Sequence, residues 1–260
     1  KPWTGWGWGE LDFAHFMTLY PGDRFCDILD NAHNLPLHLA VELGVPAALA
    51  VVVATAVLVW RARPWQETDP QRQFAWAVLA LIGLHSLVEY PLWYGPFQLA
   101  AVVCVALLLP VRPPGIRARI ACVVLALVGL ASLASVHALY DRVSDAYRLP
   151  AQRRPELRQD PVTPLGRPPL FDAQVRFAEL SITELSPANA RHVHQLAQEV
   201  LHYSPEARVV EKLIESATLL GHTDEAVAHL ARFKAAFPQR YAQWAGTPRT
   251  SGPGTAAPQR

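Results

Sequence analysis

Long apolar runs without charge constrain this chain more than any other feature. The clearest covers residues 45–59, where no Asp, Glu, Lys or Arg occurs. At about 1.5 Å per residue, a helix of roughly 20 residues crosses the ~30 Å hydrocarbon core of a membrane. We therefore predict an all-α fold that begins with polytopic membrane helices. About four spans are expected, at residues 37–60, 74–89, 97–110 and 120–140.

The composition agrees with a membrane protein. Hydrophobic residues make up 51% of the 260 residues and charged residues only 17%, with a mean hydropathy of +0.13. A net charge of +1 gives no electrostatic case for binding nucleic acid. Cys26 lies in a polar stretch, whereas Cys104 and Cys122 lie in apolar runs. These three cysteines indicate neither a disulfide framework nor a metal site.

The arginines near the predicted spans give an orientation. Six of them lie in the two turns after the first and third spans: Arg61, Arg63, Arg72, Arg112, Arg117 and Arg119. Short loops rich in Lys and Arg face the cytoplasm. Residues 1–36 and everything after residue 140 are therefore expected on the opposite, extracytoplasmic side.

The chain opens at Lys1 on a run of tryptophans and glycines, which looks like the inside of a longer protein. We expect the chain to be the C-terminal part of that protein. Residues 1–36 show neither helical nor strand periodicity and are interpreted as an ordered interfacial loop, in which aromatic rings lie at the headgroup level and glycines allow close backbone approach. A plain connecting loop with anchoring tryptophans is the alternative.

The chain changes character after the fourth predicted span. Residues 141–169 are rich in proline, which breaks regular elements, and are interpreted as a linker. Residues 170–245 then show four helical patterns, at 172–185, 188–201, 206–220 and 226–237, with Ser, Thr and Pro at their starts. Paired helices of this length predict a soluble helical-hairpin domain that resembles tetratricopeptide repeats. The tail, residues 246–260, is expected to be disordered.

A polar cluster precedes the first predicted span. Asn34, His38 and Glu42 are spaced four apart and would share one helix face, with His33 beside them. The unperturbed pKa of His is about 6.5, so an imidazole can accept a proton near neutral pH. An interfacial histidine solvated by headgroups is the alternative for His33.

A second cluster lies at the outer end of the second predicted span. His85 and Glu89 are four apart, and Tyr90 and Tyr94 follow. A histidine and a carboxylate in an apolar helix are costly unless they pair or line a polar cavity. They can pair with each other or share a cavity with His33. No zinc-type spacing such as His-Glu-x-x-His occurs here, so no metal is predicted.

These two clusters resemble a known family. His33-Asn34, nine residues and then Gly44 resemble the ligase signature His-[Asn/Ser/Gln], nine positions, Gly-x-x-[Gly/Thr/Tyr], although Ala47 takes its last position. The Gly-Trp-Gly-Trp-Gly run at 5–9 resembles the Gly-rich start of the same periplasmic loop. His-Ser-Leu-Val-Glu-Tyr-Pro-Leu-Trp-Tyr, residues 85–94, looks more specifically like the PglL-type bacterial protein O-oligosaccharyltransferases, relatives of the O-antigen ligases and Wzy polymerases.

The resemblance implies an integral protein of the bacterial inner membrane, with residues 1–36 and 141–260 in the periplasm. The implied reaction moves a preassembled oligosaccharide from undecaprenyl pyrophosphate to a Ser or Thr hydroxyl of a periplasmic or pilin-like protein. Partners would be that lipid-linked donor, the acceptor protein and membrane lipid, without nucleic acid. No cofactor is expected, because pyrophosphate is already a good leaving group and positioning can carry most of the catalysis.

The same resemblance implies roles for individual residues. His33 would act as general base on the acceptor hydroxyl or assist the pyrophosphate, and the other residues of catalytic type would be Glu42, His85 and Glu89. The substrate-binding candidates are Asn34, His38, Tyr90, Tyr94 and, for the diphosphate, Arg24. Arginines from earlier helices bind the diphosphate in the ligase relatives, so the chain by itself is expected to be inactive.

Two other functions fit the sequence. One is an O-antigen ligase or polymerase whose acceptor is a saccharide. The other is a non-enzymatic membrane scaffold whose helical-repeat region binds partners, because repeat surfaces commonly bind peptides.

Overall fold

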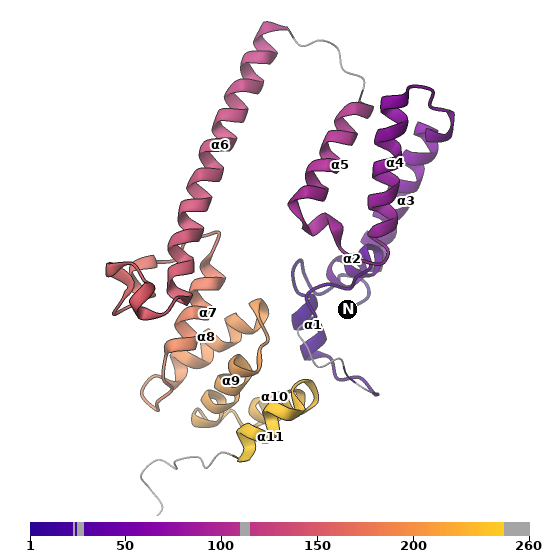
Figure 1. The fold of residues 1–260 in the computed structure, drawn as a ribbon. Coiled ribbons are helices and arrows are strands. Elements are labelled where there is room, and N and C mark those ends of the chain that lie inside the picture. The colour runs from indigo at the N-terminus through magenta and orange to yellow at the C-terminus, as the bar shows by residue number, and fades with distance from the viewer. Residues whose placement is uncertain (23, 25–28, 110–114, 247–260) are drawn as a thin grey trace, which may run out of the picture.

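The computed structural model describes residues 1–22, 24, 29–109 and 115–246. Within these ranges the chain is helical and contains no strand, in agreement with the predicted all-α class (Figure 1). The tail that was predicted to be disordered lies outside the described residues from 247 onward, and so does Cys26.

The first predicted span is interrupted near its start. Helix α2 covers Leu35–Leu43 and α3 covers Val45–Ala62, with Gly44 between them. Gly44 has φ 88°, and a Cβ there would lie 2.5 Å from the carbonyl oxygen of Trp3. Glycine here allows the close approach of the opening loop, and Pro46 in the first turn of α3 ends the preceding helix and begins the new one.

The next two apolar runs form a helical hairpin. Helix α4 covers Pro70–His85 and α5 covers Gly95–Leu108, and the two pack together with the short 3₁₀ turn η2, Pro91–Trp93, between them (Figure 1). A second short turn, η1, Pro64–Gln66, follows α3. The guanidinium of Arg72 donates to the carbonyl of Leu108 at 2.9 Å and so joins the start of α4 to the end of α5.

Helix α6, Ile116–Ser144, is the longest element and stands away from the α4–α5 hairpin in Figure 1. Two helical stretches in the described part of the chain are long and apolar enough to cross a membrane, Val45–Gln66 and Ile116–Tyr147, while α5 is shorter. Two of the four predicted spans thus meet this criterion, and the number four is not confirmed. Large apolar side chains along α6, such as Leu125 and Leu130, are exposed.

The proline-rich segment has more order than a linker requires. Four 3₁₀ turns follow α6: η3 at Asp145–Tyr147, η4 at Pro150–Gln152, η5 at Pro155–Leu157 and η6 at Thr163–Leu165. Their centre is the fully buried carboxylate of Asp145, which lies 2.6 Å from Arg148 and 3.1 Å from Arg154. The segment is therefore folded against the end of α6.

A helical domain follows, with five helices where the sequence predicts four, because the last one was not predicted. It consists of α7 (Asp172–Ile182), α8 (Ala190–Tyr203), α9 (Ala207–Leu219), α10 (Thr223–Ala236) and α11 (Pro238–Gly246), and each helix packs on its successor from α7 to α11 (Figure 1). Its core contains side chains such as Leu180, Val193, Val200, Leu213 and Phe233. Gly221 follows the end of α9 with φ 75°, the left-handed conformation in which a glycine commonly terminates a helix. Kinship with tetratricopeptide repeats stays a prediction.

The opening loop contains a helix that sequence periodicity did not indicate. Helix α1, Leu11–Met17, packs against α8 and α10, and its Phe16 is buried in the core of the helical domain. Seven residues cover two turns, too few for a clear amphipathic pattern. The segment that leads to His33 is therefore attached to the helical domain.

Candidate functional site

The predicted site forms where the start of α2 meets the end of α4. Asn34 caps α2 by accepting from the amide of Leu37 at 3.0 Å, and its side-chain amide donates to the carbonyl of Leu87 at 2.9 Å. The amide of Leu35 donates to the carbonyl of Ser86 at 2.8 Å. Asn34 thus has a positioning role, because its hydrogen bonds fix the relative place of the two polar clusters.

His33 and Glu89 form the central pair of this site. Nδ1 of His33 lies 3.1 Å from Oε2 of Glu89, and each side chain is about half exposed. His33 has φ 49°, a left-handed conformation that is uncommon outside glycine, and its ring meets the ring of Tyr90 edge-on at 4.8 Å. The backbone conformation of His33, the Glu89 carboxylate and the Tyr90 ring therefore hold the imidazole in one orientation at an accessible surface.

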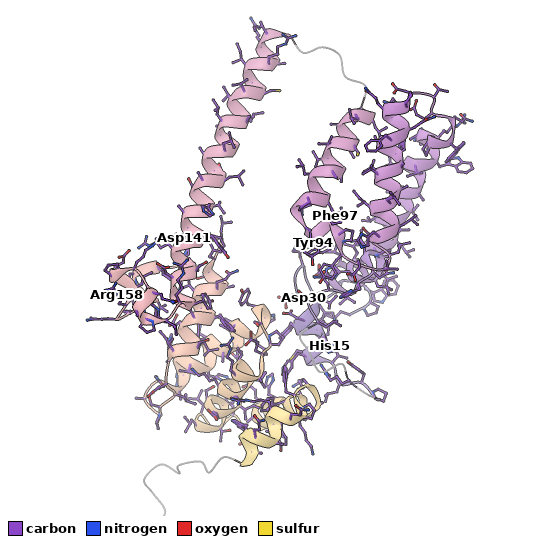
Figure 2. All side chains as sticks on the ribbon, viewed as in Figure 1. His15, Asp30, Tyr94, Phe97, Asp141 and Arg158 are labelled. Carbon is purple, nitrogen blue, oxygen red and sulfur yellow. The ribbon has the colours of Figure 1, made fainter. Side chains whose placement is uncertain are left out.

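Tyr90 and Tyr94 stack beside this pair, with ring centroids 5.6 Å apart. A hydrogen bond with Tyr94, the nearby charges and partial desolvation raise the pKa of Tyr90 to about 12. At neutral pH the phenol of Tyr90 is protonated, and its single O–H donates to Tyr94. Figure 2 shows Tyr94 and Phe97 near the same end of α5.

His38 and Glu42 form a second, buried pair on α2. Nε2 of His38 lies 3.2 Å from Oε1 of Glu42, and the same oxygen accepts from the amide of Gly9 at 2.8 Å. The amide of Gly7 also donates to the main-chain carbonyl of Glu42, and a Cβ on Gly5 would lie only 2.1 Å from that carbonyl oxygen. Glu42 therefore anchors the glycine-rich loop on α2, and the glycines are needed for this close approach.

The first pair and His38 of the second pair lie around one shallow hollow. Ten residues line it: Asn31, Ala32, His33, Asn34, Leu35, His38, Ser86, Glu89, Tyr90 and Trp93. His38 contributes its ring, which meets the edge of Trp93 at 4.8 Å, whereas Glu42 does not line the hollow. No lysine or arginine is among the lining residues in the described part of the chain, so a diphosphate would find no guanidinium within this hollow.

Two predicted site residues lie elsewhere. His85 ends α4 and faces the ring of Phe97 at 5.7 Å, and it neither pairs with Glu89 nor lines the hollow. The amide of Glu89 still donates to the carbonyl of His85 at 2.8 Å, so the four-residue turn is kept, but the Glu89 carboxylate pairs with His33 instead of His85. Arg24 donates to the main-chain carbonyls of Thr18 and His15 and lies over the ring of Tyr20, so its guanidinium is committed within its own loop.

Sequence reasoning also missed five lining residues: Asn31, Ala32, Leu35, Ser86 and Trp93. Asn31 and Ser86 are buried, and Ser86 donates from its hydroxyl to the carbonyl of Ile82. Trp93 stacks on Trp8 at 6.5 Å, which joins η2 to the opening loop. Asn31 lies two residues before His33 and Ser86 follows His85, so closeness in sequence to these predicted histidines was the signal that could have identified them.

The chemistry of the central pair is that of an oriented base. A carboxylate that accepts from Nδ1 fixes the tautomer of an imidazole and leaves Nε2 as the basic atom. His33 and Glu89 have this geometry, and the ring of Tyr90 packs edge-on against the imidazole. Such a group can take a proton from a hydroxyl that approaches the exposed side of the imidazole.

Comparison with known proteins places the chain in a family. A 102-residue segment is 28% identical to the general O-oligosaccharyltransferase of Acinetobacter baylyi (strain ATCC 33305 / BD413 / ADP1). The aligned segment makes up 38% of this chain and only 17% of that longer protein. No solved structure matches. The family described as "virulence factor membrane-bound polymerase, C-terminal" matches residues 73–251, a range that contains Glu89 and the helical domain but not His33. Because this match covers well over half of the chain, the protein belongs to that family of membrane-bound polymerase C-terminal regions.

Proposed function

We propose that the chain is the C-terminal part of a membrane glycosyltransferase of the PglL type. It would move a preassembled oligosaccharide from undecaprenyl pyrophosphate to Ser or Thr hydroxyls of periplasmic or pilin-like proteins. The observation that carries this proposal is the accessible His33–Glu89 pair, 3.1 Å apart, at the junction of two motifs that resemble that family. Family membership and the similarity to an O-oligosaccharyltransferase support it.

In the proposed step, His33 is the general base. Glu89 holds Nδ1, and Nε2 takes the proton of the acceptor hydroxyl. The hydroxyl oxygen bonds to the anomeric carbon of the glycan while the bond from that carbon to the pyrophosphate oxygen breaks. Undecaprenyl pyrophosphate leaves with the electron pair of that bond.

The rest of the whole protein would complete the site. The hollow has no cationic lining residue within the described chain, so the diphosphate would be held by groups beyond it. The proposed inner-membrane topology puts the hollow and the helical domain on the periplasmic side. Figure 1 supports this arrangement, because α2, η2 and α7 to α11 all lie toward the same end of the apolar helices. The helical domain would present the acceptor protein to the hollow.

The test is glycan transfer by the intact membrane protein carrying single substitutions. His33→Ala should abolish transfer, and Glu89→Gln should reduce it, while membrane insertion is unchanged. His85→Ala is the matched control, since its imidazole lies outside the hollow and should leave transfer near the wild-type level. Transfer that survives His33→Ala would refute the general-base role.

A ligase or polymerase with a saccharide acceptor is the second candidate, because the family description names a polymerase. A deletion strain separates the two. Loss of glycan from pilin-like proteins, detected by mass spectrometry, supports the protein acceptor. Altered lipopolysaccharide with intact protein glycans supports the saccharide acceptor. If neither glycan changes and partner binding by the helical domain accounts for the phenotype, the scaffold alternative is favoured.

A further inference from the structure

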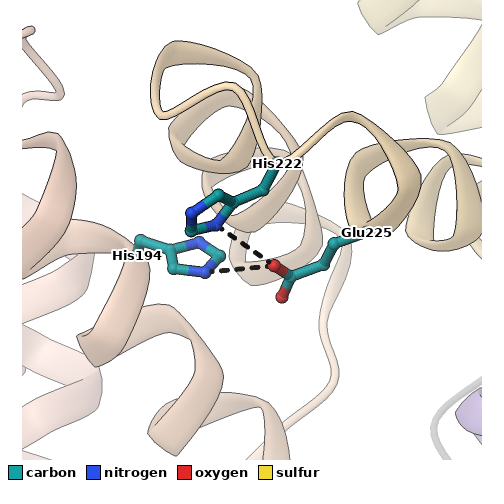
Figure 3. A group of neighbouring side chains, drawn as sticks. All are labelled: His194, His222 and Glu225. Carbon is teal, nitrogen blue, oxygen red and sulfur yellow. Dashed lines mark ion pairs between the residues drawn. The ribbon is translucent and has the colours of Figure 1, made fainter.

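A compact group of metal-ligating side chains lies in the helical domain, away from the hollow. It consists of His194 on α8, His222 just before α10, and Glu225 in the first turn of α10 (Figure 3). Oε2 of Glu225 lies 3.3 Å from Nε2 of His194 and 3.5 Å from Nδ1 of His222. One ligating atom from each residue lies within 4.8 Å of the other two.

The surrounding hydrogen bonds orient these three side chains. Nδ1 of His194, the nitrogen turned away from Glu225, lies 3.3 Å from the hydroxyl of Ser216 on α9. Oε1 of Glu225 accepts from the side-chain amide of Gln198 at 2.8 Å. Metal-ligating histidines and carboxylates usually have such outer partners, which fix the tautomer and the ring orientation. The remaining atoms, Nε2 of His194 and Oε2 of Glu225, both face the centre of the cluster.

The spacing suits a small divalent ion. Zinc bonds to histidine nitrogen at about 2.0–2.1 Å and to carboxylate oxygen at about 2.0–2.2 Å, so two ligands of a tetrahedral ion lie about 3.3 Å apart. The two measured separations from Glu225 are close to this value. His194 is buried while His222 is half exposed, so an ion can approach from the solvent side of the cluster.

We propose that His194, His222 and Glu225 bind a zinc-type divalent metal ion, with a fourth position left for water or a partner's side chain. This proposal does not depend on the glycan-transfer proposal. It departs from the expectation, drawn from sequence, that the chain has no metal site. The ligands lie 28 and three residues apart, so they match no short motif. The ion would join α8 to the turn before α10.

The full chain, purified in detergent, tests the proposal by competition for Zn²⁺ with a chromogenic chelator. We expect one tight zinc per wild-type chain and at least tenfold weaker binding in His222→Ala and in Glu225→Gln. His192→Ala is the matched control. His192 lies on α8, as His194 does, but its exposed side chain pairs with Glu179 outside the cluster. Its zinc affinity should equal that of the wild type.

Two further measurements distinguish metal bound by these three side chains from metal bound elsewhere on the chain and from loss of folding. Co²⁺ should give the absorption bands of a tetrahedral site in the wild type and in His192→Ala, and not in Glu225→Gln. Circular dichroism should show equal helicity in all variants, because His222 and Glu225 are both partly exposed. No zinc binding by the wild type, or equal binding by the wild type, His222→Ala and Glu225→Gln, would overturn the proposal.

Discussion

The carboxylate of Glu10 lies 2.8 Å from Nδ1 of His202, and this contact ties the loop that leads to His33 to helix α8. The ring of Phe13 stacks on the same imidazole at 3.8 Å. Nε of Arg232 donates to the carbonyl of Met17 at 3.1 Å. The helical domain thus holds the opening loop in place, which gives it a structural link to the hollow as well as its proposed role toward an acceptor.

Phe16→Ala should separate the loop from the helical domain. Phe16 is 2% exposed within that core, and truncating a buried phenylalanine typically costs about 3–5 kcal/mol. Hydrogen exchange of the full chain in detergent should show faster exchange in α1 and in the facing turns of α8 and α10. Trp3→Ala is the control, since Trp3 is 80% exposed and should leave this exchange unchanged. Unaltered protection of α1 in Phe16→Ala would contradict the prediction.

The helical domain could be predicted from the sequence in some detail because amphipathic helices carry their burial pattern in their own residues. Helix α9 was expected at 206–220 and is found at Ala207–Leu219, and α10 was expected to end at Phe237 and ends at Ala236. The prediction that Ser and Thr side chains cap these helices is wrong for α8, α9 and α10, because no side chain makes a capping hydrogen bond at their first turns.

The candidate site was predictable in part. His33 and Glu89 were singled out because ionisable groups beside apolar helices need partners, and they are each other's partner. The choice of partner could not be predicted from spacing. His85 and Glu89 are joined by an i to i+4 main-chain hydrogen bond, yet the carboxylate pairs with His33, because Asn34 and Leu35 bond to the carbonyls of the turn that follows α4. The break at Gly44 has a local signal in Pro46, in the first turn of α3, whereas the close approach of Trp3 comes from a distant part of the sequence.

Gly44→Ala should loosen the opening loop from the joint between α2 and α3. Alanine is strained at φ 88°, and its Cβ would overlap the carbonyl of Trp3, so we expect a cost of about 1–3 kcal/mol from the backbone alone. Limited proteolysis should cut residues 1–9 faster than in the wild type. Gly83→Ala is the control, because a Cβ there meets nothing within 4 Å and alanine favours the helix. Equal cleavage rates for both variants would contradict this interpretation.

Asp12 should make the stability of the loop depend on pH. Burial, opposed in part by its bond to the amide of Phe13, raises the pKa of Asp12 to about 6, with Glu10 and Asp30 adding to the shift. The ordinary pKa of Asp is about 3.9. Between about pH 4 and pH 6 the folded chain holds a proton that the unfolded chain releases, so stability falls as the pH rises through this window.

Asp12→Asn tests this dependence, since asparagine keeps an acceptor for the amide of Phe13 and cannot ionise. The variant should have a higher Tm than the wild type at pH 7.5, and the difference should shrink toward pH 4. Thermal unfolding of the full chain at several pH values measures it. Glu156→Gln, at an exposed position, should show no such trend. A pH-independent difference for Asp12→Asn would refute the assignment.

Asp145→Ala should unfold the turns after α6. The carboxylate is fully buried, whereas Arg148 and Arg154 are 47% and 37% exposed and stay solvated without it, so we expect the loss of these charge-assisted hydrogen bonds to cost about 1.5–3 kcal/mol. Asp141→Ala is the control, because Asp141 contacts the same two arginines from a position that is 45% exposed, where ion pairs contribute about 0–1 kcal/mol. Urea unfolding of the full chain compares the two, and similar midpoints would contradict the prediction.

Glu42 and Glu89 should behave differently although the family resemblance implies a catalytic-type role for both. Glu42 is buried, pairs with His38 and accepts from the amide of Gly9, so Glu42→Ala leaves these donors unpaired inside the protein. We expect it to lower the yield of folded protein and the Tm. Glu89 is half exposed, and its loss should leave folding intact.

The activity of the intact membrane protein then separates the two carboxylates. Glu89→Gln should lower glycan transfer at an unchanged Tm, because glutamine cannot stabilise the protonated imidazole of His33. Glu42→Gln should keep part of the Tm that Glu42→Ala loses, since its side-chain oxygen can still accept from Gly9. If Glu42→Gln folds like the wild type and yet abolishes transfer, then Glu42 acts on the substrate, and anchoring of the glycine-rich loop does not account for its function.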